Sequence, residues 1–255
     1  MFDALITELS QIDTVEAIAL GGSRAGEHYD EKSDYDVYVY GTVDENIRRN
    51  ILGKYCTILE IGNHFWEYED NCRLKNGVDL DILYRNLDDF VADIATVVEQ
   101  FQARNGYTTC MWHNLLHSKI LYDRDGRLKK AQERFNVPYP EELQEAIVFR
   151  NYKLLQSSMP AYRTQISKAL RRKDLVSMNH RVTAFLESYF DILFALNEQT
   201  HPGEKRLMQL CKECCQVLPA HFEENLYNLF FDLYSAPDRV DNDIANIIGQ
   251  LQRIL

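Results

Sequence analysis

The feature that most constrains the fold of this 255-residue chain is a pair of aspartates at the start of a strand-like segment. Asp34 and Asp36 flank a tyrosine, and residues 37–40 that follow are β-branched and aromatic, as is typical of a β-strand. Because residues two apart on a strand face the same side, we expect the two carboxylates to project together. Neighbouring anions repel each other, so the pattern indicates a bound cation.

A glycine-rich turn precedes the pair and extends the predicted site. Gly21-Gly22-Ser23 ends a short apolar run, and ten residues separate it from Asp34. Such a turn between a strand and a helix offers backbone N–H groups and a hydroxyl to phosphate oxygens. Mg²⁺ takes one or two protein carboxylates and completes its shell with water and substrate phosphates. We therefore expect one nucleotide site, with phosphate at Gly22 and Ser23 and magnesium at Asp34 and Asp36.

A later acidic strand supplies a third carboxylate. Residues 78–84 (VDLDILY) alternate acidic and apolar side chains, the pattern of a half-buried strand. Asp79 and Asp81 share one face of it, and either can complete the metal cluster or accept the proton of an attacking hydroxyl. Asp81, which lies deeper in the strand, is our first choice, and Asp79 is the alternative.

The two halves of the chain differ in character. In the first half, helical spacing or strand composition predicts helices at 2–10, 44–54, 87–102 and 109–117, and strands at 15–20, 36–40, 56–61, 78–84 and 119–122. From about residue 140 strand signals vanish, and amphipathic runs broken by prolines predict helices, with breaks near Pro160, Pro202, Pro219 and Pro237. Prolines at 138 and 140 mark a hinge, so we expect domains at 1–137 and 138–255.

The order Gly-Ser, Asp-x-Asp on a strand and an acid on a later strand resembles the signature of the polymerase-β-type nucleotidyltransferases. Further similarity is to two-domain bacterial members related to aminoglycoside and lincosamide antibiotic nucleotidyltransferases, carried by Ser33–Val37, Leu83–Arg85, Ile120–Asp123, Phe194–Asn197 and Pro202–Arg206. The resemblance implies an α/β (α+β) fold, with a mixed-sheet catalytic domain followed by a helical substrate-binding or lid bundle. It also implies that the glycine-rich turn contacts a triphosphate and that the paired acids and the later one bind two magnesium ions.

The reaction implied is transfer of NMP from an NTP, ATP by default, to a hydroxyl of a small molecule such as an antibiotic, with release of pyrophosphate. Lys205 and Arg206 follow Pro202-Gly203 at an expected helix start, where cations are unfavourable unless an anion meets them. We expect Lys205 to contact the triphosphate. The alternative function is that of a regulatory or antitoxin-type member that binds or nucleotidylates a partner protein.

Charge and composition limit the partners and the location. The chain has 28 bases and 39 acids, a net charge of −11, which argues against binding a long nucleic acid and suits a cationic acceptor. No stretch approaches the roughly 18 apolar residues of a membrane span. The N-terminus has acids where a signal peptide has bases, and the six cysteines show no regular spacing, so we expect reduced thiols in the cytoplasm.

Overall fold

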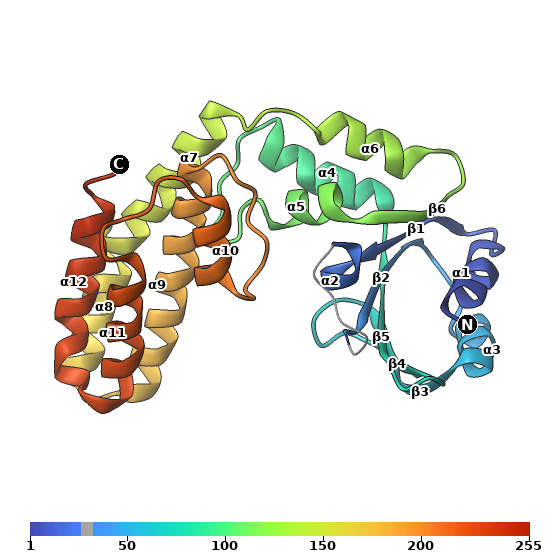
Figure 1. The fold of residues 1–255 in the computed structure, drawn as a ribbon, viewed down its shortest axis with the longest axis horizontal. Helices are drawn as coiled ribbons and strands as arrows, with labels where there is room; N and C mark the ends of the chain where they lie inside the picture. The colour runs from blue at the N-terminus through green and yellow to red at the C-terminus, as the bar shows by residue number, and fades with distance from the viewer. Residues whose placement is uncertain (27–32) are drawn as a thin grey trace. The chain divides into compact units, whose positions relative to one another are not determined.

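The computed structural model describes residues 1–26 and 33–255, which fall into two compact units (Figure 1). The sheet unit comprises Met1–Ala95 and Asn114–Val137, and the helical unit comprises Thr96–His113 and Pro138–Leu255. Residues 96–113 thus lie N-terminal to the boundary expected at residue 137 but belong to the helical unit. The division into functional domains 1–137 and 138–255 stays a prediction.

The sheet unit is built on a mixed sheet with strand order β3-β4-β5-β2-β1-β6. The described strands are β1 (Val15–Gly21), β2 (Tyr35–Gly41), β3 (Cys56–Asn63), β4 (Glu69–Leu74), β5 (Asp79–Arg85) and β6 (Lys119–Asp123). Strands β2 and β5 are parallel, and the other neighbouring pairs are antiparallel. The predicted α/β class with a mixed sheet is confirmed.

Helices α1 (Phe2–Ser10) and α3 (Glu45–Tyr55) cover one face of the sheet (Figure 1). Their apolar residues pack against alternate residues of the central strands, and the shared core includes Leu5, Leu9, Leu52, Val37, Val39, Leu80 and Ile82. Because side chains alternate along a strand, Asp36 and Asp81 lie on the opposite face. The unit also contains α2 (Gly22–Ala25) and α6 (Arg127–Phe135).

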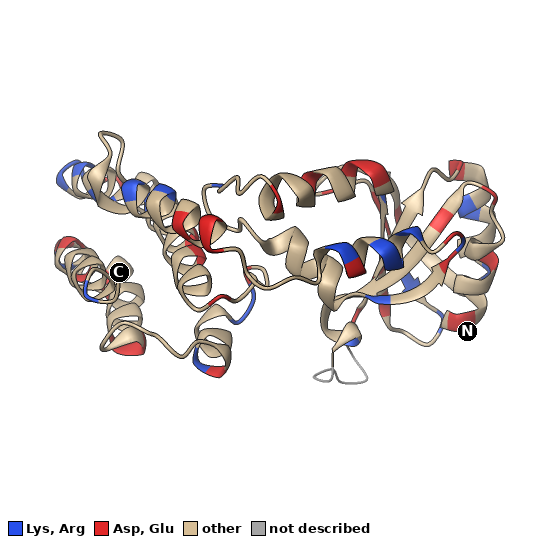
Figure 2. Cartoon of the chain, turned by 90° about the horizontal axis from the view of Figure 1, so that it is seen from above, with Lys and Arg blue, Asp and Glu red and all other residues tan. Residues whose placement is uncertain are grey.

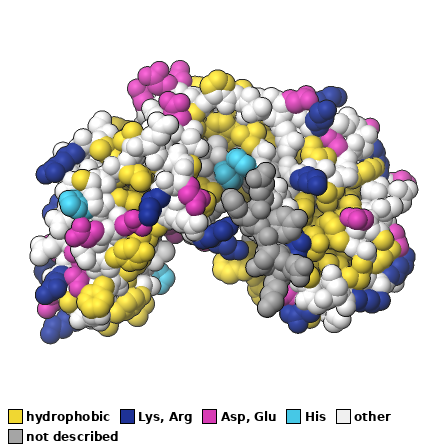
Figure 3. Space-filling model, viewed as in Figure 1, with side chains coloured by type: hydrophobic (Ala, Val, Ile, Leu, Met, Phe, Trp, Pro, Cys, Tyr) yellow, Lys and Arg dark blue, Asp and Glu magenta, His cyan; other side chains and the backbone are white. Residues whose placement is uncertain are grey.

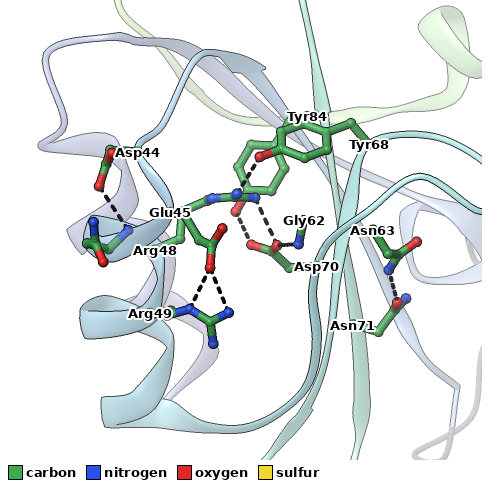
Figure 4. A network of polar contacts seen from close by, with 11 residues as sticks. Asp44, Glu45, Arg48, Arg49, Gly62, Asn63, Tyr68, Asp70, Asn71 and Tyr84 are labelled. Carbon is green, nitrogen blue, oxygen red and sulfur yellow. Dashed lines mark hydrogen bonds and ion pairs between the residues drawn. The ribbon is translucent and has the colours of Figure 1, made fainter.

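A buried ion pair joins α3 to β4 on the face of the sheet that α1 and α3 cover (Figure 4). Arg48 and Asp70 are both fully buried, and the guanidinium Nη1 lies 2.8 Å from the carboxylate Oδ1. The backbone N–H of Gly62 donates to Asp70 at 2.7 Å, and the hydroxyl of Tyr84 donates at 2.9 Å. These bonds satisfy a charge that would otherwise be costly to bury, and they fix β4 in the sheet.

The elements expected from the sequence are present, with three differences. Strand β4 and helix α6 were not predicted, and the helix expected at 87–102 is α4 (Leu87–Val98), which ends before Phe101 adopts a left-handed φ of 55°. The sequence of β4, EDNCRL, lacks the usual alternation because it carries polar groups on both faces. Asp70 faces α3, and Asn71 faces the opposite side.

The helical unit is arranged around α9 (Leu175–Leu196), whose side chains Phe185, Tyr189 and Leu193 are buried in its core. The other helices are α7 (Glu141–Tyr152) with a π-helical continuation to Ser157, α8 (Tyr162–Arg171), α10 (Leu207–Cys214), α11 (Phe222–Ser235) and α12 (Val240–Leu251). Helix α5 (Cys110–His117) spans the boundary between the two units. The breaks expected at Pro160, Pro202 and Pro219 fall between helices, and Pro237 begins a short 3-10 helix, Pro237–Arg239, between α11 and α12. The predicted C-terminal helical region is confirmed. Within the described residues, every helix is too short or too polar to span a membrane.

A buried carboxylate holds residues 96–113 to the helical unit. Asp191 on α9 is 1% exposed and accepts hydrogen bonds from the backbone N–H and the hydroxyl of Thr108, at 2.9 and 2.7 Å. The side-chain amide of Asn151 on α7 donates to the same carboxylate at 3.0 Å. Three donors satisfy the group, although burial still raises the pKa of Asp191 to about 6.

Candidate active site

A row of directly paired residues crosses the four central strands. Asp36 on β2 is the register partner of Asp81 on the parallel strand β5. Asn71 on β4 is the partner of Asp81 from the other side, and Gly21 on β1 is the partner of Asp36. The pairing of β2 with β5 brings together two acids that are 45 positions apart in the sequence.

Three carboxylates converge at this row. Asp34, Asp36 and Asp81 are half-buried, and one carboxylate oxygen from each lies within 4.8 Å of the other two. Asp34 immediately precedes β2, which begins at Tyr35, one residue before the start expected from the sequence. Oxygen donors alone, carrying up to three negative charges, are the set that Mg²⁺ prefers. A divalent cation bound there would offset their mutual repulsion.

The structure separates the two candidates for the third acid. Asp79 forms an ion pair with Arg73, its cross-strand partner on β4, with Nε 2.6 Å from Oδ1, and both side chains are about half exposed, at 52% and 53%. Asp81 instead joins Asp34 and Asp36, and its Oδ1 accepts a hydrogen bond from Asn71 at 2.7 Å. Both acids line a pocket of about 400 Å³, together with Ser33, Asp34, Leu59, Asn71 and Cys72.

A short relay of amides lies behind Asp81. The side-chain amide of Asn63 donates to Oδ1 of Asn71 at 2.6 Å (Figure 4). Asn71 in turn donates its own N–H to Asp81. This orients the carboxylate, as groups behind a metal ligand commonly do. The sequence does not indicate this role for either asparagine. Asn71 belongs to β4, the strand that local patterns do not predict.

The glycine-rich turn lies against the acids. Gly22 has a φ of +59°, and a Cβ at this position would be 1.8 Å from Oδ2 of Asp36. Only glycine fits there, since any side chain would displace the carboxylate. Ser23 follows in the single helical turn α2. The structure thus brings Gly22 and Asp36 into contact, while the role of Gly22 and Ser23 in phosphate binding stays a prediction.

Arg24 ties the turn to the acids and was not singled out by the sequence. Its Nε donates to the backbone oxygen of Ser33 at 2.6 Å, one residue before Asp34. Its guanidinium also lies 4.0 Å from the centre of the Tyr35 ring. One side chain therefore fixes the start of β2 relative to α2.

A second charged network covers the same face further along β5. Arg85 makes two hydrogen bonds to the carboxylate of Glu67, at 2.7 and 2.6 Å, and its guanidinium lies 4.2 Å from the ring centre of Tyr38. Asn114 accepts from Arg85 at 3.1 Å and donates to the Tyr38 hydroxyl at 2.8 Å. Burial, the largest effect, raises the pKa of Tyr38. The network links Arg85 of β5 to Tyr38 of β2 on the face that carries the acidic cluster.

Lys205 lies elsewhere in the chain. It belongs to the helical unit, is exposed, and is separated from the start of α10 by Arg206. Its contact with a triphosphate stays a prediction.

Comparison with known families agrees with this geometry. Residues 3–108, which include the turn and all four candidate acids, match the nucleotidyltransferase domain family. The chain carries a nucleotidyltransferase domain. The enzyme class predicted from the sequence is thereby confirmed. Residues 108–207 of this nucleotidyltransferase match a second family, described as a domain of unknown function, DUF4037. Among proteins of curated function, none matches the chain in sequence.

Two solved structures show a distant likeness. A nucleotidyltransferase-like protein from Exiguobacterium sibiricum 255-15 is 12% identical, with a TM-score of 0.42, over 98% of this chain and 72% of the other. An aminoglycoside 6-adenyltransferase from Bacillus subtilis is 11% identical, with a TM-score of 0.29, over 98% of this chain and 90% of the other. At these scores the likeness carries no functional argument.

Proposed function

We propose that this nucleotidyltransferase transfers NMP from a magnesium-bound NTP to an acceptor hydroxyl. The acceptor oxygen forms a bond to the α-phosphorus, the bond from that phosphorus to the β-phosphate oxygen breaks, and pyrophosphate leaves. The observation that carries the proposal is the convergence of Asp34, Asp36 and Asp81 within 4.8 Å, next to the turn at Gly22. This arrangement lies within a region that matches nucleotidyltransferase domains.

Each part of the site has a distinct task. Asp34, Asp36 and Asp81 would hold the metal, which when bound neutralises phosphate charge and makes the acceptor hydroxyl more acidic. Asp81, whose carboxylate accepts a hydrogen bond from Asn71, would also accept the proton of the acceptor hydroxyl. The N–H groups and hydroxyl of Gly22 and Ser23 bind phosphate oxygens, and ATP is the donor we expect.

The acceptor we propose is a small hydroxylated molecule, cationic rather than anionic, such as an antibiotic. The net charge of −11 supports this, since acidic residues occur in both units (Figure 2) and would repel a phosphate backbone. The helical domain, 138–255, would bind the acceptor, and Lys205 would contact the triphosphate. A cytoplasmic location is part of the proposal, supported by the irregular spacing of the six cysteines, which is unlike a disulfide framework.

The test is transfer from α-phosphate-labelled ATP, GTP, CTP or UTP by the purified chain, with and without Mg²⁺. Aminoglycosides, lincosamides, neutral sugars and short RNA serve as acceptors, alongside a lysate fraction for protein labelling. We expect label on a small cationic acceptor, lost on chelation and in Asp36→Asn. Labelling of a protein alone would favour the partner-modifying alternative, and RNA extension alone would overturn the small-molecule acceptor.

A further inference from the structure

The helical unit contains a pocket of about 780 Å³ whose lining shares no residue with the acidic cluster. One face of α9 forms its first wall, with Thr183, Leu186, Glu187 and Phe190 at helical spacing. The facing walls are α10 and one face of α11, and Tyr107 contributes from the segment before α5. The volume is that of a site for a small organic ligand.

The lining combines aromatic rings with carboxylates. Tyr107, Phe190, Tyr227 and Phe230 supply rings, and Tyr227 and Phe230 remain 61% and 42% exposed. Apolar side chains also reach the surface of this unit beside charged ones (Figure 3). Aromatic faces attract cations, and the attraction strengthens where water is excluded.

The four carboxylates in the pocket differ in whether they have an ion-pair or hydrogen-bond partner. Glu223 is paired with Lys212 at 2.8 Å, and Glu213 accepts a hydrogen bond from Gln209 at 2.7 Å. Glu187 and Glu204, by contrast, have no ion-pair or hydrogen-bond partner in the part of the chain that the structure describes. The pocket thus has two carboxylates to which a ligand can bind.

The charges of Glu187 and Glu204 both affect the hydroxyl group of Tyr107. Their carboxylates raise the pKa of the Tyr107 hydroxyl, after burial as the main cause, to about 12. Gly106 packs against α9 so closely that a Cβ there would lie 2.8 Å from Cβ of Glu187. Burial alone raises the pKa of Glu187. A cation beside Tyr107 would therefore meet two acids and several rings.

We propose that this pocket binds an amphipathic organic amine, with the ammonium group between Glu187 and Glu204 and the apolar body against Phe190, Tyr227 and Phe230. Because four carboxylates outnumber two cations in the lining, the pocket favours a cation over a nucleotide or other anion. The site lies entirely within the helical unit, so the inference does not depend on the proposed transfer reaction.

Calorimetric titration of the full chain tests the proposal with three probes of equal size. Phenylbutylamine is cationic, phenylbutanol is neutral and phenylbutyrate is anionic. We expect the amine to bind about tenfold more tightly than the alcohol, the contribution of one charge-assisted contact, and the acid to give no measurable heat. Equal affinity for amine and alcohol, or binding of the acid, would overturn the assignment.

Variants separate the pocket from the general acidity of the chain. Glu187→Gln and Glu204→Gln should each weaken amine binding several-fold and leave the affinity for the alcohol unchanged. Glu224→Gln is the matched control, because Glu224 neighbours Glu223 on α11 but does not line the pocket. Because Glu204 is exposed in a loop, its variant remains informative if Glu187→Gln unfolds. If the control weakens binding as much as the pocket variants, the proposal fails.

Discussion

Asn71 donates its side-chain N–H to Oδ1 of Asp81 at 2.7 Å, from the position directly opposite on the neighbouring strand. Loss of this bond leaves the Asp81 carboxylate free to rotate away from Asp34 and Asp36. We predict that Asn71→Ala lowers transfer by roughly tenfold to a hundredfold, with a higher magnesium requirement, because groups behind metal ligands act on that scale. Turnover measured against Mg²⁺ concentration checks this.

Asn63 provides the graded control for that prediction. It acts on Asp81 only through Asn71, so Asn63→Ala should lower transfer less than Asn71→Ala does. If both variants turn over at the wild-type rate, the amide relay has no role in positioning Asp81.

The two acids of β5 give the second prediction. Asp81→Asn should abolish transfer, whereas Asp79→Asn should keep it within a few-fold, because Asp79 pairs with Arg73 at the surface and exposed pairs contribute little. Thermal melting should show Asp81→Asn as stable as the wild type or more so, since it relieves repulsion among three carboxylates. The opposite ranking of the two activities would reassign the third ligand to Asp79.

The sequence predicted β2 from its β-branched and aromatic residues and β5 from its alternating acidic and apolar residues. Val37, Val39, Leu80 and Ile82 all enter the core, and this period is visible in a single segment. This alternation could not show which of Asp79 and Asp81 joins the metal cluster, since residues two apart on a strand share a face. Their difference depends on β4, which places Asn71 opposite one and Arg73 opposite the other.

Long-range pairings explain what the sequence did not predict. Strand β4 is held by the ion pair of Asp70 with Arg48, 22 positions away, and no local pattern encodes such a contact. The segment 96–113 joins the helical unit because Thr108 binds Asp191, 83 positions later. The pocket at Glu187 likewise depends on three helices that meet only in the fold.

A third prediction concerns ligand binding. A ligand that binds only the folded state stabilises it by about 2.7 kcal/mol at a hundredfold excess over its dissociation constant. ATP with Mg²⁺ should therefore raise the melting temperature more than either alone, because in the proposed site the acids and the phosphate oxygens would share the metal. An equal shift with sulfate at matched ionic strength would count against a nucleotide site.

The fourth prediction uses two glycines with left-handed backbones. Gly22 (φ +59°) contacts Asp36, whereas a Cβ added at Gly77 (φ +89°) would meet nothing within 4 Å. Both alanine variants should lose about 1 kcal/mol or more of stability from backbone strain. Only Gly22→Ala should also lose transfer, because its Cβ would displace Asp36, a proposed metal ligand. Equal activity in the two variants would show that the contact with Asp36 is unimportant.

The last prediction is a pair of opposite pH dependences in the helical unit. Burial raises the pKa of Asp191 from its ordinary 3.8 to about 6, so the folded state holds a proton that the unfolded state has lost. The contribution of Asp191 to the free energy of unfolding therefore falls as the pH rises from about 4 to 6, by about 3 kcal/mol in total. Burial, with a smaller effect of His113, lowers the pKa of His201 from 6.5 to about 3. The contribution of His201 to the free energy of unfolding is therefore complete above pH 6.5 and is lost as the pH falls below that value.

Denaturant titrations between about pH 4 and pH 6 separate the two groups when each variant is compared with the wild type, because all other titrations cancel. Asp191→Asn should gain relative stability as the pH rises, since only the wild type then carries the buried charge. His201→Asn should gain relative stability as the pH falls, since the wild-type unfolded state then binds a proton that its folded state refuses. The backbone N–H of Gly203, which donates to Nδ1 of His201 at 3.1 Å, can donate to the asparagine oxygen instead. Slopes of the same sign for both variants would contradict the assigned directions of the two pKa values.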